Sequence, residues 1–110
     1  MGFAVAWVSL GIAGLLEVVW AYAMKQSDGF TRLGPTVITI TALLGSVGLL
    51  ALAMRAIPLS TAYPIWTGIG AVGAFLIGVA ILGEQATPGR IVAATLIIAG
   101  LVTMKLSSSP

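Results

Sequence analysis

Residues 3–24, FAVAWVSLGIAGLLEVVWAYAM, form an apolar run that contains a single charged side chain, Glu17. A helix needs about 20 predominantly apolar residues to cross the hydrocarbon core of a bilayer. Two windows of the same kind follow at residues 33–54 and 61–82, and a shorter one covers residues 91–104. The sequence therefore predicts an all-α membrane protein with four transmembrane helices.

The composition of the whole chain agrees with this prediction. Of its 110 residues, 59% are hydrophobic and 7% are charged, whereas soluble domains carry roughly 25% charged residues. Arg90 and Lys105 bracket the short fourth window, and their long side chains can extend to the interfaces of a short helix. We expect one transmembrane domain over residues 1–110, with helices at about 3–24, 33–54, 61–82 and 90–106.

Several function classes are excluded by residue usage. Cysteine and histidine are absent, so the usual ligands of transition metals are missing, and we expect neither a metal site nor a cofactor. The five Lys and Arg residues give a net charge of only +2 and are scattered, which is too sparse for a nucleic-acid surface. The partners to expect are the lipid bilayer and small solutes.

The loop charges give almost no preferred orientation. With four spans, Lys25, Arg32 and Arg90 lie on one side of the membrane, and Arg55 and Lys105 lie on the other. An excess of Lys and Arg normally marks the cytoplasmic side. Either the lipids or the translocon fix one orientation of the chain, or different copies of the chain insert in opposite orientations. In the second case, two inverted chains could form an eight-helix assembly with its site near the midplane.

Glu17 is the residue that most needs a function. It precedes Lys25 by eight residues, which places it about 12 Å from that end of the helix and near the middle of a core about 30 Å thick. A charge there costs about 2.5–3.5 kcal/mol, so we expect Glu17 to face the bundle interior. It could serve as a neutral bridge between helices, although Gln or Asn would do the same. We favour competition between a proton and a mobile cation, as in an antiporter.

Residues at helical spacing from Glu17 suggest the rest of a site. Gly14, three residues earlier, would leave space beside the carboxylate, and Trp20, three residues later, would add an aromatic face. In the second window, Ser46 lies in the stretch GSVG. A lone serine in such a helix often bonds its own backbone or allows close packing, so its role stays open on this ground.

The third window contains STAYPIWTGIGAVGA, residues 60–74. Helical spacing places Tyr63, Trp66 or Thr67, and Gly70 on one face, where they offer a phenol, an indole and close backbone approach. Tyr63 could instead belong to the aromatic belt at the membrane interface. Pro64 does little harm if the helix begins near Ser60, and the following glycines then mark the better hinge.

Together, the lone Glu of EVVWA (17–21), GFTR (29–32) and AYPIWTGIG (62–70) make the chain resemble the small multidrug resistance family. The Trp after the glutamate and the Thr in IWTGIGAVGA (65–74) resemble its guanidinium-exporter subtype. The quaternary-ammonium exporters typically have Ser in place of Thr67, directly after the Trp of the third helix. They also lack the Trp of the first helix.

The resemblance implies an antiparallel homodimer in the bacterial inner membrane that exchanges guanidinium for protons by alternating access. Glu17 would bind both cations, Gly68 and Gly70 would mark a bend, and the fourth helix would pack in the dimer. The site-lining residues would be Gly14, Trp20, Ser46, Tyr63 and Trp66. Pro64 and Ser60 depart from the pattern of the subtype, which usually has Ala and Gly there, so the contacts of Tyr63 could shift.

The chemistry of guanidinium suits this site, because its planar donor fork matches a carboxylate and its faces stack on aromatic rings. Two alternatives stay open. The substrate could be a hydrophobic quaternary ammonium or substituted guanidinyl cation. The chain could also be a non-transporting accessory protein or one half of a heterodimer.

Overall fold

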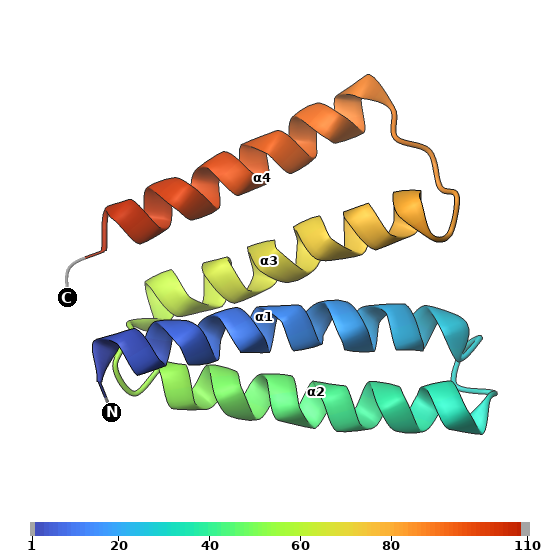
Figure 1. Cartoon of the computed structure of the whole chain (residues 1–110), viewed down its shortest axis with the longest axis horizontal. Coiled ribbons are helices and arrows are strands. Elements are labelled where there is room, and N and C mark those ends of the chain that lie inside the picture. The colour runs from blue at the N-terminus through green and yellow to red at the C-terminus, as the bar shows by residue number, and fades with distance from the viewer. Residues whose placement is uncertain (1, 109–110) are drawn as a thin grey trace.

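A computed structural model of the chain describes residues 2–108. Its four helices are α1 (Phe3–Gln26), α2 (Leu33–Ala53), α3 (Leu59–Ala80) and α4 (Pro88–Leu106), and no strand occurs in this range. All four are long and apolar enough to cross a membrane. Consecutive helices run in opposite directions (Figure 1). The predicted all-α protein with four transmembrane helices is confirmed.

The helix α1 is the centre of the bundle. It lies between α2 and α3 (Figure 1) and makes its most extensive contacts with these two helices. The core is formed by small and apolar residues at the end of the bundle where the chain begins: Ala6, Leu10, Ala13, Leu50, Ala53, Ile57, Ala62, Ile65 and Trp66. Both Glu17 and the residues that follow it lie on this central helix, so any site around Glu17 can draw on α2 and α3.

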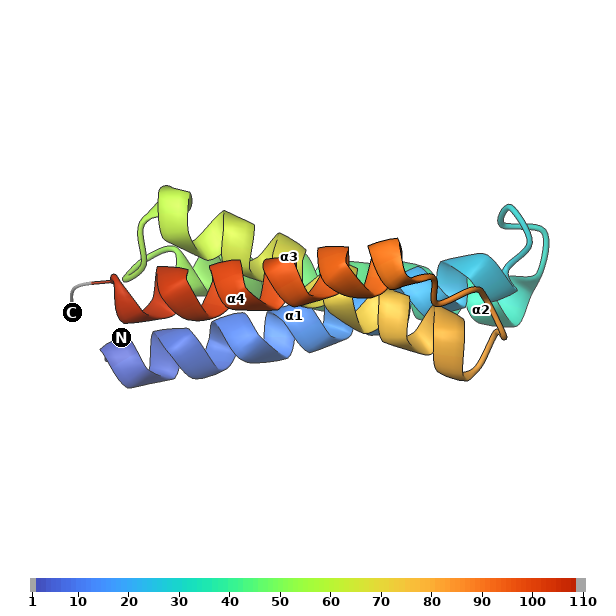
Figure 2. The same ribbon diagram turned by 90° about the horizontal axis from the view of Figure 1, so that it is seen from above.

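The helix α4 is set apart from the other three. It packs chiefly against α3, apart from the Lys105 ammonium, which lies over the Trp7 ring of α1, and none of its residues is buried. Seen from above, it runs along the bundle rather than into it (Figure 2). Its exposed side chains include Val92, Leu96 and Val102. This helix therefore offers an almost complete apolar surface to lipid or to another chain.

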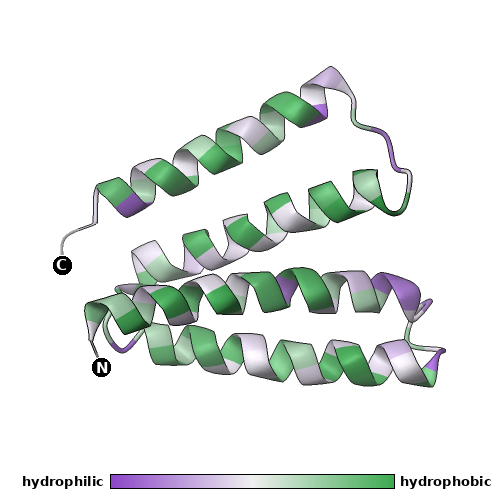
Figure 3. Ribbon diagram, in the orientation of Figure 1, coloured by the Kyte–Doolittle hydropathy of each residue, from purple (hydrophilic) through white to green (hydrophobic). Residues whose placement is uncertain are grey.

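Apolar residues also occur along the whole length of α1 to α3, and the most polar residues lie mainly near the helix ends and loops (Figure 3). Large exposed hydrophobic residues include Val8, Leu15 and Leu44. In water such a surface would drive aggregation, whereas in a membrane an apolar surface is the normal one to face lipid. The arrangement of hydropathy in space thus agrees with the membrane assignment.

Local signals set the ends of two helices. The Thr87 hydroxyl accepts a hydrogen bond from the Arg90 N–H at 3.3 Å, and Pro88 occupies the first turn of α4. A threonine cap followed by proline is a typical helix start, and it explains why α4 begins before the apolar window. After α1, three successive residues, Asp28, Gly29 and Phe30, have positive φ, which produces the tight turn into α2.

The start of α3 differs from the position considered from the sequence. Because the helix begins at Leu59, Pro64 lies in its second turn rather than in its first. A proline there cannot donate the backbone hydrogen bond to Ser60 that helix geometry requires. The helix is nevertheless continuous to Ala80, and Pro64 is exposed. The proline removes one hydrogen bond near the helix start without interrupting α3.

Candidate functional site

The carboxylate of Glu17 lies at the contact between α1 and α3. A Cβ atom added to Gly70 would overlap this carboxylate, so the absence of a side chain at position 70 leaves room for the carboxylate where it lies. The Glu17 Oε1 atom is buried and has no hydrogen-bond partner within residues 2–108. A carboxylate oxygen is a strong hydrogen-bond acceptor, and burying one without a donor costs free energy. The arrangement is therefore suited to a donor that comes from outside the chain.

Two further glycines bring α1 and α3 together on either side of this point. A Cβ at Gly14 would come within 2.7 Å of the Ile69 side chain, and a Cβ at Gly73 would overlap Val18. Gly14 therefore makes room for Ile69, and its place beside the carboxylate stays a prediction. Gly70, which the sequence did not connect with the carboxylate, approaches Glu17 from the other helix.

A buried hydrogen-bond chain links all three central helices. The Trp66 Nε1–H donates to the Ser46 Oγ at 2.9 Å, and the Ser46 hydroxyl donates to the Ala13 carbonyl oxygen at 2.6 Å. Ser46 is completely buried and Trp66 is 8% exposed. In an α-helix the carbonyl of Ala13 also accepts the backbone N–H of Glu17, four residues later. Ser46 and Trp66 are thus attached to the turn of α1 that holds the carboxylate.

The remaining aromatic residues lie less deeply. Tyr63 is 49% exposed, and its ring centroid is 5.4 Å from that of Trp66 in a tilted arrangement. Trp20 is half-buried, and its Nε1 atom has no hydrogen-bond partner in the described part of the chain. The structure therefore pairs Tyr63 with Trp66, while Trp20 remains an unused donor on the helix of Glu17.

The glycines singled out as a hinge make different contacts. Gly70 faces Glu17, whereas a Cβ at Gly68 would come within 2.5 Å of Leu101 on α4. Gly68 thus allows α4 to approach α3, and bending at either residue stays a prediction. Sequence reasoning gave no role to Ile69 or Leu101 and treated Gly73 only as one of the possible hinge glycines. The repeated glycines of α3 were visible, but the residues opposite them were not.

No group of three or more His, Cys, Asp or Glu side chains that could hold a metal ion occurs within residues 2–108.

A sequence profile of the Small Multidrug Resistance protein matches residues 5–97. The chain belongs to the Small Multidrug Resistance family. This match confirms the resemblance seen in the motifs around Glu17 and Trp66.

Curated relatives extend the match to almost the whole chain. Proteins named guanidinium exporter from Citrobacter freundii and Escherichia coli (strain K12) are each 53% identical over 103 residues, which covers 94% of this chain and 98% of theirs. The protein of the same name from Salmonella typhimurium strain LT2 is 54% identical over the same lengths. The Small Multidrug Resistance protein described here is accordingly a multi-pass transporter of the bacterial inner membrane and not an enzyme.

Proposed function

We propose that this chain exports guanidinium in exchange for protons, with Glu17 binding each in turn. The observation that carries the proposal is the Glu17 carboxylate, which lies against Gly70 between two packed helices and keeps one buried oxygen without a partner in the described residues. Relatives at 53% identity are named guanidinium exporters, which supports guanidinium as the substrate.

The chemistry of the site suits a small planar cation. Guanidinium offers pairs of parallel N–H donors, and a carboxylate accepts such a pair in two charge-assisted hydrogen bonds. Its flat faces are attracted to aromatic rings, with indole the strongest partner. Trp20 lies one turn from Glu17 on α1. The hydrogen bond to Ser46 fixes the plane of the Trp66 ring, so these residues would orient the cation.

Coupling to protons would follow from competition for one group. A carboxylate that has bound guanidinium has no free charge for a proton, and a protonated carboxylate has no charge for guanidinium. If each form of the site moves across the membrane and the empty charged form does not, the two fluxes are tied together. Bending at Gly68 and Gly70 would supply part of that movement.

We place this chemistry in an antiparallel homodimer. The near balance of loop charges supports insertion in both orientations. The helix α4 has no buried residue in a single chain, so its apolar surface is available to pack against a second copy. Such a dimer would bring a second Glu17, with inverted symmetry, to the same chamber.

Binding of guanidinium to the purified protein at several pH values tests the proposal. As pH falls and protons occupy Glu17, the apparent affinity should fall by up to about tenfold per pH unit, which is the limit for one competing proton. Glu17→Gln should bind no guanidinium, whereas Asp28→Asn, in the exposed turn after α1, should behave as the parent protein.

The same protein in liposomes separates the alternatives. Proton-driven guanidinium uptake by Glu17→Gln would refute the mechanism. Tight binding of tetraphenylphosphonium without guanidinium binding would assign a hydrophobic cation as the substrate. A folded protein that transports nothing unless a sister chain is added would support a heterodimer.

A further inference from the structure

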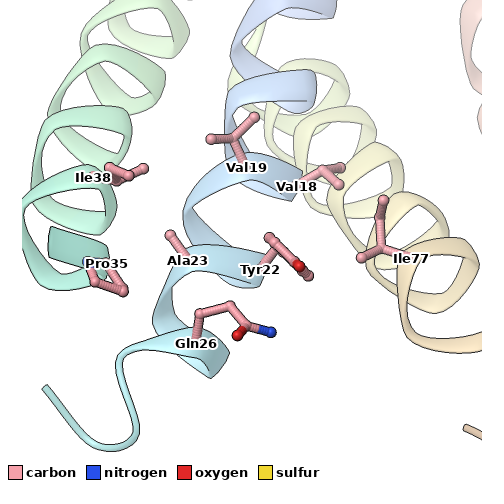
Figure 4. A pocket seen from close by; sticks show the side chains of 8 residues that line it. All are labelled: Val18, Val19, Tyr22, Ala23, Gln26, Pro35, Ile38 and Ile77. Atoms are coloured by element: carbon pink, nitrogen blue, oxygen red, sulfur yellow. The ribbon is translucent and has the colours of Figure 1, made fainter. Parts of the chain in front are cut away.

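An apolar groove crosses all three central helices at the end of α1 that leads into the first loop (Figure 4). Its volume is about 450 Å³, and its lining comes from α1, α2 and α3: Val18, Val19, Tyr22, Ala23, Gln26, Pro35, Ile38 and Ile77. The only polar side chains in this lining are the Tyr22 phenol and the Gln26 amide, which Figure 4 shows toward the end of α1. The groove is thus apolar along its length and polar at one end.

This groove is separate from the site around Glu17. Each residue of an α-helix is rotated by about 100° from the one before, so Tyr22 points about 140° away from Glu17. Glu17 and Trp20 do not line the groove. Glu17 is therefore not part of the groove, although the next residue, Val18, is, and the proposed guanidinium chemistry makes no use of the groove.

A second, smaller cavity adjoins the groove and carries two opposite charges. It has a volume of about 160 Å³, shares Val18, Tyr22 and Ile77 with the groove, and is also lined by Lys25 and Glu84. This volume equals that of roughly five water molecules. Lys25 belongs to the last turn of α1 and Glu84 to the loop after α3, so both charges lie where the bundle meets the membrane interface.

The position of Glu84 is set by the end of α3. Its backbone N–H donates to the Gly78 carbonyl oxygen at 2.9 Å. A Cβ atom at Gly78 would overlap the Glu84 carboxylate. The loop thus folds back over the helix, and the absence of a side chain at Gly78 allows Glu84 to lie beside the cavity.

We propose that the groove and the charged cavity together bind one phospholipid with an ethanolamine headgroup. The groove follows α1 from Val18 to Gln26, about 12 Å along the helix axis, and an acyl chain lies in this same direction across the membrane. The phosphate meets Lys25, and the ammonium group, which carries three N–H donors, meets Glu84. Tyr22 and Gln26 lie between the headgroup and the chain.

Charge complementarity selects this lipid among common phospholipids. A phosphatidylglycerol offers a phosphate to Lys25 but leaves Glu84 without a cation. A phosphatidylcholine offers a cation, but its methylated nitrogen has no N–H to donate to the carboxylate. Of these three headgroups, only ethanolamine supplies an anion for Lys25 and a hydrogen-bonding cation for Glu84 in one molecule.

Native mass spectrometry of the delipidated full-length protein, titrated with the three lipids carrying identical acyl chains, tests the headgroup. We expect the ethanolamine lipid to bind at least about tenfold more tightly than the glycerol lipid. Glu84→Gln should abolish this preference. Lys25→Gln should weaken the binding of both the ethanolamine lipid and the glycerol lipid. Arg55→Gln, an exposed change in the loop between α2 and α3, should leave all three affinities unchanged. Equal binding of the three lipids, or an unchanged preference in Glu84→Gln, would overturn the proposal.

A change in the groove tests the acyl chain separately. Val19→Trp should fill the groove and weaken all three lipids by at least about tenfold. Val8→Trp, on the same helix but outside the groove, is the matched control, because both valines are exposed, at 45% and 62%. Circular dichroism confirms that each variant keeps its helices. If Val19→Trp changed the association of two copies and left lipid binding intact, the groove would belong to a second chain and the proposal would be wrong.

Discussion

Replacing Ser46 by alanine removes the centre of the hydrogen-bond chain that supports Glu17. The serine hydroxyl accepts from Trp66 Nε1–H at 2.9 Å and donates to the Ala13 carbonyl at 2.6 Å. Both contacts are lost in Ser46→Ala. The Trp66 indole N–H is then left buried without an acceptor, and the turn of α1 that carries Glu17 loses this hydrogen bond to α2.

The magnitude follows from these two bonds. Hydrogen bonds between membrane helices contribute on average about 0.6 kcal/mol each, with measured values up to about 1.7 kcal/mol. A buried donor left without a partner adds about 1–3 kcal/mol. We expect Ser46→Ala to destabilise the folded protein by about 2 kcal/mol, within the range of these contributions. Guanidinium affinity should fall with it, because Trp66 and the Glu17 turn would no longer be held in place.

A double-mutant cycle with Trp66→Phe isolates the bond between the two side chains. Reversible unfolding in detergent, followed by circular dichroism, gives the free energy of unfolding for the four proteins. The coupling energy should be about 0.6–1.7 kcal/mol. Thr95→Ala, which also removes a hydroxyl but from the exposed surface of α4, should change stability by less than about 0.5 kcal/mol. A coupling energy of zero would show that the bond between Trp66 and Ser46 does not stabilise the protein.

Two other substitutions test contacts seen only in the structure. Gly70→Ala should weaken guanidinium binding by at least about tenfold, because its Cβ would displace the Glu17 carboxylate; Gly48→Ala, where a Cβ meets nothing within 4 Å, should not, and titration calorimetry compares the two. Lys105→Ala removes an ammonium that lies 4.3 Å from the centroid of the Trp7 ring. It should lower the free energy of unfolding by about 0.5–1 kcal/mol, and an unchanged value would show that this link between α4 and α1 is not formed.

The number and type of the helices could be read from the sequence because each depends on one segment alone. A run of apolar residues long enough to cross the bilayer must form a helix, since its backbone groups find no partners in lipid. The position of Glu17 within such a run singled it out, and the motifs around Trp20 and Trp66 gave the family. All of these are local properties of the chain.

The partners of each residue across helices needed the tertiary structure. Helical spacing indicates which residues share a face, but it does not give the rotation of the helix packed against that face. Spacing could therefore place Gly14 on the face of the carboxylate, but it could not show that the packing of α3 brings Gly70 against the carboxylate. Ser46, ambiguous as a lone serine, takes its role from Trp66, twenty residues away, and from Ala13 on another helix.

The sequence by itself determined that this protein spans the membrane four times with a carboxylate near the middle of its first helix. The tertiary structure decided which side chains surround that carboxylate. The reason is that hydropathy acts on each segment independently, whereas contact between helices depends on how close their backbones come. Gly70 and Gly73 let α1 and α3 approach closely, and this approach fixes the surroundings of Glu17.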